Sequence, residues 1–462
     1  MYCRFLFSFL VLLQIDGFGQ ASHPEFVGLP PMVKYTAEDF GTNSQVWATI
    51  QDQDGLIYIA STAGIKQFDG ERWVLIADNY IQAFLKNKDR IYAGGFESIG
   101  YIAQSADRIQ YHSLSHLIPE GAEFTVIRNI HQIGSDIFFV AHEQIFVFNT
   151  ETESMLNIPS EQMLYPSQKV NEQLIVKVDG KGLHTLKNDQ LNPVADGELW
   201  AIENVARIEA IDGGNFITLS SQSGIIKYQN NKRQKTELFD HPYYQSNALF
   251  HSTRLKNGHF ALSFLTGGLV LTDSLFNPLL ILDELTEVGA QVHHVYEDDQ
   301  NDLWISTNEG LVYLNLSSPL SYVGKNLGLE GAVHGSLIVD DEWYLSSYSG
   351  VFHKSIDPST DPFSPKRRSF QKIKDSPVGA MSVIKCNDGE LFSTHNSTKG
   401  IIKDHEFTAL LTHNNTYHSS AIYDSDQDII ITNNVDGKHL EIFKRINQNW
   451  QHSNTIFDDR LP

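Results

Sequence analysis

Short apolar runs separated by polar turns recur along the whole chain. In residues 297–314 a polar turn leads into an apolar strand, a small turn closed by Gly310 and a second apolar strand. Residues 51–68 repeat this order, with Gly64 at the position of Gly310. A unit that recurs within one chain constrains the fold more strongly than any local pattern does, so these repeats decide the architecture.

Further copies of the unit follow, and ten can be counted in the sequence. The turn glycines at positions 224, 268, 310 and 350 are 44, 42 and 40 residues apart. A period of roughly 40–45 residues with several strands per unit is that of a four-stranded propeller blade. The pattern predicts an all-β fold, a β-propeller of about ten four-stranded blades. Clear copies lie at 217–228, 260–271, 343–353 and 391–402, and weaker ones around 91–102, 137–148, 174–186 and 429–443.

The same pattern predicts where the strands lie. Each blade should begin with a strand that alternates between the two faces of its sheet. Residues 21–42 are predicted as a lead-in, because Pro24, Pro30 and Pro31 forbid a regular strand at their own positions. The first strand of blade one is predicted from Val46, and the later first strands near Ile81, Val126, Val170, Ala206, Ala248, Val292, Val333, Met381 and Ser419.

The repeat resembles that of the two-component regulator propeller family. The resemblance rests on the polar turn, the Leu/Ile–Trp/Tyr–Ile strand, the Ser-Thr pair and the Gly–Leu/Ile pair, and it covers nearly all of the chain beyond the N-terminal segment. In that family such arrays form the periplasmic sensor half of membrane-bound regulators, followed by a β-sandwich module, a transmembrane helix and a kinase or helix-turn-helix output. The resemblance implies a region that senses an extracellular ligand, a glycan or an oligosaccharide, and has no enzymatic activity of its own.

Ten blades exceed the usual four to eight of one closed ring. We expect a first propeller of about seven blades over residues 20–320 and three blades of a second propeller over 321–462. A single, unusually large ring is the alternative. Three blades cannot close and would leave strand edges exposed, so the chain is expected to be a truncated piece of a longer protein.

Residues 1–19 have the pattern of a secretory signal peptide. Arg4 supplies the positive charge, and residues 5–13 form an apolar core too short to span a bilayer. No later apolar run reaches the roughly 18–20 residues that a membrane helix needs. We therefore expect an exported protein, periplasmic or at the cell surface, that is tethered to a membrane only through an absent C-terminal helix.

The charge of the chain limits its binding partners, and its cysteine content limits its disulfides. The chain has 34 Lys and Arg against 56 Asp and Glu, a formal charge of −22. A negative surface repels phosphate backbones, so direct nucleic-acid binding is not expected. Cys3 lies in the signal segment, which leaves Cys386 alone and excludes an intramolecular disulfide.

Motifs for cofactor, metal or catalytic chemistry are missing from the sequence. Residues 424–428 begin like a calcium loop but lack its later glycine and carboxylate, and they fall on the repeat's polar turn. His293 and His294 are adjacent, so a regular strand would point them to opposite faces. No cofactor, metal site or catalytic residue is therefore predicted.

A propeller gathers the loops that enter its first strands around one mouth of the central channel. Aromatic side chains there can stack on sugars, and Arg, Gln and His can hydrogen-bond hydroxyls or carboxylates. Ordinary polar loop residues are the alternative interpretation of the same positions. The candidate ligand-binding residues are Gln45, Tyr80, Gln82, Arg128, Tyr244, Gln291 and His334.

Two other functions stay open at this stage, an exported polysaccharide lyase or hydrolase and a protein-interaction scaffold. The enzyme would need charged residues with perturbed pKa values at the channel mouth. The scaffold would need an exposed apolar patch on a blade rim. Residues 355–375, with three prolines and a basic run, are either an excursion loop or a docking loop. A homodimer is a further expectation.

Overall fold

The computed structural model describes residues 28–41, 45–105, 108–235, 243–244, 247–282, 291–357, 359–360, 368–412, 420–433 and 439–457. The predicted signal peptide lies outside these residues. The described part of the chain forms ten four-stranded antiparallel sheets. The predicted fold class, a β-propeller of about ten four-stranded blades, is confirmed.

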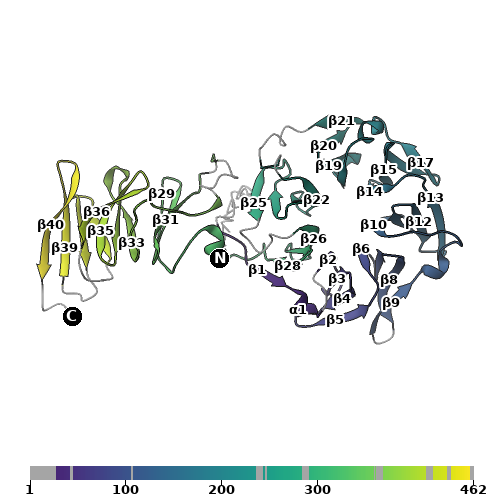
Figure 1. Ribbon diagram of the computed structural model, residues 1–462, viewed down its shortest axis with the longest axis horizontal. Coiled ribbons are helices and arrows are strands. Elements are labelled where there is room, and N and C mark those ends of the chain that lie inside the picture. The colour runs from purple at the N-terminus through teal and green to yellow at the C-terminus, as the bar shows by residue number, and fades with distance from the viewer. Residues whose placement is uncertain are drawn as a thin grey trace, which may run out of the picture.

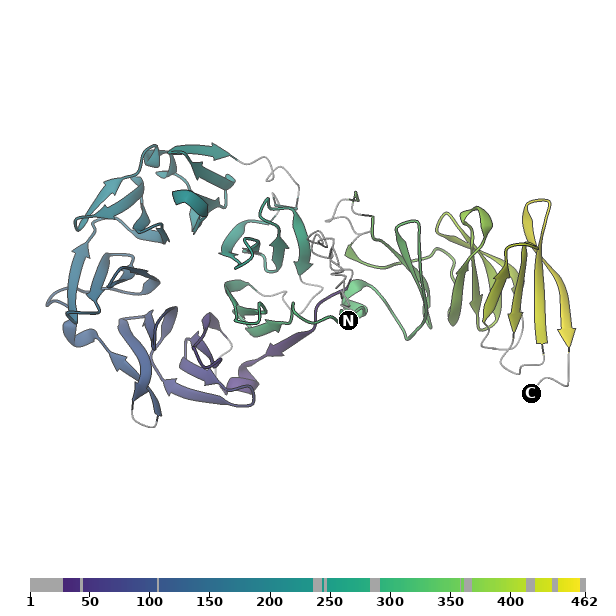
Figure 2. The ribbon, with the colours of Figure 1, turned by 180° about the vertical axis from the view of Figure 1, so that it is seen from behind.

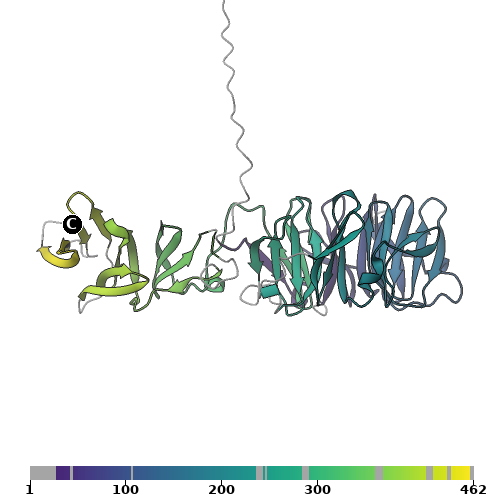
Figure 3. The same cartoon turned by 90° about the horizontal axis from the view of Figure 1, so that it is seen from above.

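Seven of the sheets surround a common centre, and Figures 1 and 2 show this ring from its two faces. Within it each first strand contacts the first strand of the next sheet, and β26 contacts β2, which closes the cycle. Seen from above, the ring is a flat disc (Figure 3). The first sheet comprises β2 (Val46–Gln51), β3 (Ile57–Ser61), β4 (Gly64–Phe68) and β5 (Trp73–Ala77), and the second comprises β6 (Ile81–Asn87), β7 (Arg90–Gly95), β8 (Ser98–Ser105) and β9 (Arg108–Ser113). The third comprises β10 (Ile127–Ile133), β11 (Asp136–Ala141), β12 (Gln144–Asn149) and β13 (Ser154–Pro159), and the fourth comprises β14 (Leu164–Val170), β15 (Gln173–Val178), β16 (Gly182–Lys187) and β17 (Gln190–Pro193). The fifth comprises β18 (Val205–Ala210), β19 (Phe216–Ser220), β20 (Gly224–Gln229) and β21 (Lys232–Lys235), and the sixth comprises β22 (Leu249–Arg254), β23 (Phe260–Phe264), β24 (Leu269–Thr272) and β25 (Pro278–Leu282).

The seventh sheet joins the two ends of the ring. Its inner strands are β26 (Val292–Glu297), β27 (Leu303–Thr307) and β28 (Gly310–Leu314), and its outermost strand is β1 (Met32–Tyr35) from the N-terminal side. β1 pairs antiparallel with β28, with Met32 opposite Leu314. The backbone ladder between these strands is what holds the disc closed.

The remaining three sheets form a second unit, the three-sheet unit, beside the ring (Figure 1). Their first strands contact one another in sequence order. Leu327 and Leu329 lie in one buried cluster with core residues of both the seventh sheet and the eighth, so the two units share apolar contacts. The division at residues 320 and 321 stays a prediction. The strands are β29 (Val333–Val339), β30 (Glu342–Ser347), β31 (Gly350–Ser355) and β32 (Gln371–Lys372); β33 (Ala380–Lys385), β34 (Leu391–His395), β35 (Thr398–Lys403) and β36 (Glu406–Thr412); β37 (Ala421–Asp424), β38 (Ile429–Asn433), β39 (His439–Ile446) and β40 (Asn449–Phe457).

The described helices are all single turns in the connections between strands. The four-residue α1 follows β1 and is capped by Gly41 in a left-handed conformation. None of the described helices is long and apolar enough to cross a membrane. The helices are α1 (Ala37–Phe40) and the 3₁₀ turns η1 (Ser115–Leu117), η2 (Gly197–Trp200), η3 (Asp212–Gly214), η5 (Lys325–Leu327) and η6 (Asn387–Gly389).

The polar turn of the repeat is built by one aspartate. In the seventh sheet Asp298 Oδ1 accepts the backbone N–H groups of Gln300 and Asp302 at 2.9 and 3.0 Å. Its Oδ2 accepts the indole N–H of Trp304 at 3.0 Å. The carboxylate therefore holds the turn and anchors the aromatic residue of the following strand. Asp and Asn favour such turns because their side chains bond the backbone two residues on.

The glycine of the repeat is required by close backbone packing. Gly310 has φ +138°, and a Cβ at this position would lie 2.2 Å from the carbonyl oxygen of Tyr35 on the closing strand. Gly64 has φ +116°, and a Cβ there would lie 2.0 Å from the carbonyl oxygen of Ala77. The third strand can thus pair with the fourth only where the side chain is missing.

Apolar side chains fill the space between neighbouring sheets. Tyr92 of the second sheet lies against Phe139 and Phe148 of the third, with ring centroids 6.1 Å apart in both pairs. All three side chains are buried. The core is therefore a series of layers between blades.

Two strand predictions are wrong. The fourth sheet begins at Leu164, so Val170 is the last residue of its first strand and not the start. Pro166 lies within this strand, at a β-bulge where the ladder is interrupted and no N–H is needed. The predicted lead-in contains β1, which begins directly after Pro31 and has no apolar repeat of its own.

The predicted interruption at residues 355–375 begins at the last residue of β31 and includes β32, the third and fourth strands of the eighth sheet. Lys366 and Arg367 of its basic run lie outside the described residues. The choice between an excursion loop and a docking loop therefore stays a prediction.

Candidate functional site

A β-bulge occurs at the start of the first strand in each of the seven ring sheets. The pairing of the first with the second strand shifts register directly after the first residue, as between Val46 and Ala48. A bulge leaves its extra residue outside the ladder and re-aims the side chain. The bulged positions are Trp47, Gln82, Arg128, Tyr165 with Pro166, Ala206, Phe250 and His293.

The re-aimed side chains meet in one cavity of about 300 Å³. All seven first strands contribute to its wall, so it occupies the centre of the ring. Its wall contains Trp47, Gln82, Arg128, Tyr165, Phe250 and His293 at bulged positions, and β18 contributes Arg207, the residue after its bulged Ala206. The bulges thus convert a repeated backbone feature into a pocket with a different side chain from each blade.

One wall of the cavity is aromatic. The rings of Trp47 and His293 lie 4.5 Å apart, and Trp47 lies 6.3 Å from Tyr80. Phe250 meets His293 edge-on at 6.3 Å. Flat, half-buried rings of this kind offer an apolar surface with polar atoms at its edge.

A chain of hydrogen bonds joins Arg128 and Gln82 of the cavity wall to Tyr80. Arg128 Nη1 donates to Gln82 Oε1 at 2.6 Å, and Gln82 Nε2 donates to the Tyr80 hydroxyl at 2.7 Å. Across the mouth, Gln45 Nε2 lies 3.4 Å from His293 Nε2. These contacts fix the orientation of donors and acceptors before any ligand arrives.

A second layer of polar groups lines the cavity more deeply. Arg207 Nε donates to Glu209 Oε1 at 3.0 Å, and this carboxylate is buried. His131 Nε2 lies 3.0 Å from Ser167 Oγ, and the Thr49 backbone N–H lies 3.4 Å from His294 Nδ1. His131 and His294 thus each contact a neighbouring first strand, whereas Arg207 pairs with Glu209 on its own strand, β18.

The histidines of the cavity are neutral at physiological pH. Burial lowers the pKa of His131 and of His294 to about 3, and the nearby Arg207 lowers both further. Burial together with Arg207 also holds the pKa of His251 well below its ordinary value. Burial and then Arg128 lower the pKa of His293 to about 4. These rings serve as neutral hydrogen-bonding groups.

Two of the seven predicted ligand-binding residues, Gln82 and Arg128, line the cavity, and Gln45 and Tyr80 contact residues that line it. Gln45, Tyr80, Gln82 and Arg128 form the contacts described above. Gln291 lies next to β26, and its carbonyl accepts the Asn308 N–H at 3.1 Å. Their role as ligand contacts stays a prediction.

The other two predicted residues lie elsewhere. Tyr244 is buried, with its ring centroid 6.1 Å from that of Phe264. His334 is the bulged residue of β29 in the three-sheet unit, where its Nδ1 lies 3.1 Å from the Ala380 carbonyl. Neither residue is among those that line the central cavity.

Sequence reasoning missed Trp47, Tyr165, Arg207 and Phe250 in the wall. It also placed His293 and His294 on opposite faces, which is wrong because both line the cavity. The bulge between Val292 and His294 breaks the alternation on which that argument rested. The signal that could have found these residues is positional, the residue after the apolar anchor of each first strand.

One possible metal-ligand set lies in the three-sheet unit, within the part of the chain that the structure describes. Ligand atoms of Glu342, His353 and His405 lie within 4.8 Å of one another. The two imidazole rings are stacked at 3.8 Å, with 19° between their planes. Stacked rings direct their in-plane lone pairs side by side and not at one point, so this arrangement suits packing between blades better than coordination.

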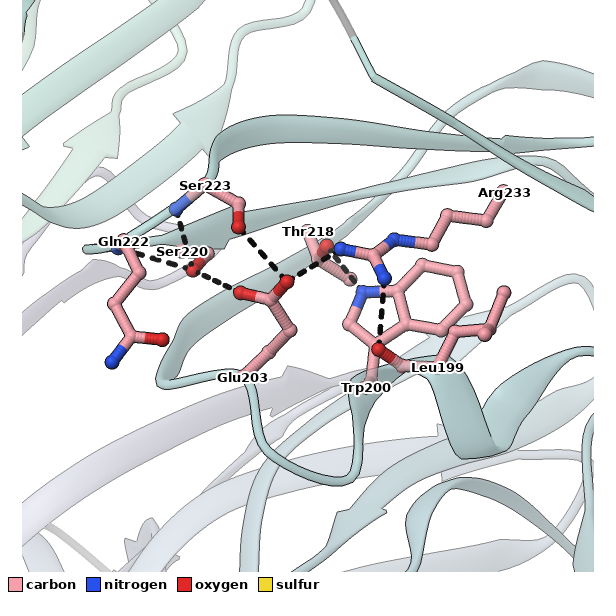
Figure 4. Close-up of polar contacts among 8 residues, drawn as sticks. All are labelled: Leu199, Trp200, Glu203, Thr218, Ser220, Gln222, Ser223 and Arg233. Atoms are coloured by element: carbon pink, nitrogen blue, oxygen red, sulfur yellow. Dashed lines mark hydrogen bonds and ion pairs between the residues drawn. The ribbon is translucent and has the colours of Figure 1, made fainter.

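A buried polar cluster in the fifth sheet is a structural element (Figure 4). Glu203 accepts hydrogen bonds from Ser220 at 2.7 Å and Ser223 at 2.9 Å, and pairs with Arg233. The Arg233 guanidinium also lies over the Trp200 ring, 5.2 Å from its centroid. The Glu203 carboxylate is engaged by three side chains, so the cluster stabilises the blade turn.

Comparison with known proteins identifies the repeat. Residues 287–309 match the model of the two component regulator propeller family. The match falls on the repeat from which the resemblance was first drawn. No curated protein matches the chain.

A solved structure of another protein shares the fold. The extracellular domain of BT3049, assigned to a hybrid two-component system of B. thetaiotaomicron, aligns over 93% of this chain with a TM-score of 0.64 and 14% identity. The chain spans 60% of the length of that domain. The extracellular domain of BT4673, assigned to a one-component system of the same organism, aligns over 92% of this chain and 67% of its own length with a TM-score of 0.48 and 12% identity.

Proposed function

We propose that this chain, one repeat of which matches the two component regulator propeller family, is the exported ligand-sensing region of a signal-transduction regulator. Its ligand is a glycan or an oligosaccharide, bound in the cavity at the centre of the ring. The supporting observation is the set of bulges, which turns one side chain from nearly every blade into the same cavity. A repeated backbone feature that gathers unlike side chains in one place suits recognition of a ligand with several different groups.

The chemistry of the wall favours a sugar. Trp47 and Phe250 offer flat apolar surfaces, while Gln82, Arg128 and His293 offer hydrogen-bonding atoms in the same cavity. A sugar ring has the complementary character, since its C–H faces are apolar and its rim carries hydroxyl groups. Sites with mostly apolar walls and a few oriented polar groups are typical of small-ligand recognition.

Binding is favoured over catalysis by the acid–base groups present. Glycoside hydrolysis uses a pair of carboxyl groups that flank the scissile bond. The described residues that line the cavity include no Asp or Glu, and the nearby Glu209 is buried against Arg207. Neutral histidines and two arginines can orient a ligand without cleaving it.

Signalling would follow from a difference in affinity. A ligand can shift a conformational or dimer equilibrium only as far as it binds one state better than the other. The proposal assigns the readout of that shift, and the membrane tether, to regions outside this sequence.

The test measures the thermal stability of the protein against a panel of oligosaccharides, with release of reducing ends followed in the same samples. A ligand at 100 times its dissociation constant should stabilise the protein by about 2.7 kcal/mol. The Trp47→Ala variant should lose the shift, because it removes the aromatic wall. The Tyr348→Ala variant should keep it, because this tyrosine is 56% exposed and lies in the three-sheet unit.

Each outcome separates the candidate functions. A saturable shift without product, lost in Trp47→Ala, supports the proposal. Released product would make the chain an enzyme. A shift that survives in Trp47→Ala would place the ligand outside the cavity and overturn the assignment of the site.

A further inference from the structure

We propose that the ligand of the central cavity carries an anionic group, a carboxylate or a sulfate ester on the sugar, and that Arg128 binds it. The inference rests on the proposed function and specifies its ligand class. It is based on the charge of the cavity wall, which is opposite in sign to the net charge of the chain. The protein has a formal charge of −22, yet the cavity wall is cationic.

The two arginines of the wall differ in their partners. Arg207 donates to Glu209 at 3.0 Å, so its charge is balanced inside the protein. Arg128 donates to the neutral amide oxygen of Gln82 and forms no ion pair with any residue that the structure describes. A half-buried guanidinium next to a neutral partner keeps both its charge and most of its five N–H donors for a ligand.

No other residue in the described wall of the cavity balances the positive charge of Arg128. Its lining residues include no carboxylate, and its histidines are neutral at physiological pH. The positive field also reaches across the mouth, because Arg128 contributes to the lowered pKa of His293. An anionic group on a ligand would therefore meet an attractive and uncompensated charge.

Gln82 gives this charge a fixed direction. Its amide lies between Tyr80 and Arg128, accepting from the guanidinium and donating to the phenol oxygen. A guanidinium held in place loses little side-chain freedom when it binds, and its planar fork matches the two oxygens of a carboxylate or sulfate. Arg128 is therefore better suited to binding a planar or tetrahedral oxyanion than to binding a single hydroxyl group.

A neighbouring hollow has the opposite charge. Glu97, Glu123 and Glu143 line a more open space of about 690 Å³ beside the second and third sheets. The molecule thus presents acidic side chains in one depression and a free arginine in another. An anionic sugar would be repelled by the first and bound by the second.

The experiment uses pairs of probes that differ only in charge. One pair is the trisaccharide of α-1,4-linked galacturonic acid and its fully methyl-esterified form, and the other is a sulfated galactose trisaccharide and its desulfated form. Binding of each to the protein and to Arg128→Gln, Arg128→Lys and Arg72→Gln is measured by calorimetry. Arg72 is exposed on a turn at the ring surface, which makes it the matched loss of one positive charge.

We expect one charged probe to bind at least tenfold more tightly than its neutral partner. Arg128→Gln should weaken that binding by about tenfold to one hundredfold, the range for losing a charged hydrogen bond. Arg128→Lys should retain part of the affinity, because it keeps the charge and loses the fork. Arg72→Gln should bind as the unchanged protein does, and circular dichroism should show that every variant is folded.

The outcomes distinguish this inference from the proposed function. Tight binding of a carboxylate or of a sulfate probe, lost in Arg128→Gln, supports it and names the group. Equal binding of charged and neutral probes, or an unchanged affinity in Arg128→Gln, overturns it and leaves the oligosaccharide site standing. If neither these probes nor the wider neutral panel binds, the proposed function fails, and this inference fails with it.

Discussion

A single aspartate has two structural roles in each well-formed repeat. In the seventh blade Asp298 holds the turn through two backbone N–H groups and fixes Trp304 through its indole N–H. In the first blade Asp52 accepts the N–H groups of Asp54 and Leu56 and the hydroxyl of Tyr58. The spacing of six residues between the acid and the aromatic side chain is therefore a hydrogen-bond requirement.

Replacing this acid should be costly. The Asp298→Ala variant leaves three buried or partly buried donors without their acceptor, so we expect a loss of about 3 kcal/mol in the free energy of unfolding. Urea titration of both proteins gives the difference. The adjacent Asp299→Ala is the control, because Asp299 is exposed and its only described ion pair, with Lys256, spans 3.7 Å. Equal effects of both variants would show that the turn does not depend on the buried carboxylate.

A second prediction concerns pH. Burial raises the pKa of Glu203, but the hydrogen bonds from Ser220, Ser223 and Arg233 outweigh it, so the folded-state pKa is lowered. A lowered folded-state pKa adds stability above the unfolded value of about 4.3, and this stability is lost as the pH falls further. We therefore expect Glu203→Gln to be less stable than the unchanged protein by about 2–4 kcal/mol at pH 7.

This difference should shrink as the pH falls from 5 towards 3. Denaturant unfolding of both proteins at each pH measures it, and the exposed Glu198→Gln, in the same segment, controls for the loss of one negative charge. A difference that stays constant over this range would mean that the carboxylate is not the group that titrates.

At the scale of elements, the closing strand decides whether the ring exists. β1 adds Tyr35 to an aromatic group at the seam, with ring centroids 5.3 Å from Phe68, 5.7 Å from Trp73 and 6.1 Å from Trp304. Two of these rings belong to the first sheet and one to the seventh. The strand therefore joins the ends of the ring both by its backbone ladder and by its one large side chain.

Removing that side chain should weaken the closure. We expect Tyr35→Ala to lower the free energy of unfolding by about 3 kcal/mol, as for other large-to-small changes in packed aromatic sites. Val33→Ala on the same strand is the control, because Val33 is 46% exposed. Amide exchange in β28 should speed up in Tyr35→Ala alone. Unchanged exchange there would place the stability of the closure in the backbone ladder.

The elements also show which features the sequence could predict. The strands of blades one and seven were predictable because turn acid, aromatic residue and glycine all carry local signals. β1 was not, since it pairs with a strand about 280 residues away in the chain (Met32 with Leu314) and has no repeat beside it. The cavity was predicted in part: Gln82 and Arg128 are polar at the mouth, whereas Trp47 and Phe250 resemble core residues until the bulge is known.

For the whole molecule, the distribution of charge matters more than its sum. A formal charge of −22 makes exposed carboxylates repel one another, which costs stability in the folded state. The central cavity departs from this background through Arg128, which acts over a few ångströms on whatever it binds. Salt should therefore affect folding and binding through different charges.

We expect the melting temperature to rise when NaCl is increased from 20 to 300 mM, because screening at a Debye length of about 10 Å or less reduces repulsion between distant carboxylates. The ratio of dissociation constants for a charged trisaccharide, Arg128→Gln over the unchanged protein, should fall over the same range. This ratio isolates the contribution of Arg128, since both proteins share the remaining charges. Differential scanning fluorimetry and calorimetry at matched salt give the two quantities. A ratio that rises with salt would contradict a direct charge–charge contact, while a melting temperature that falls would mean that local ion pairs outweigh the overall repulsion.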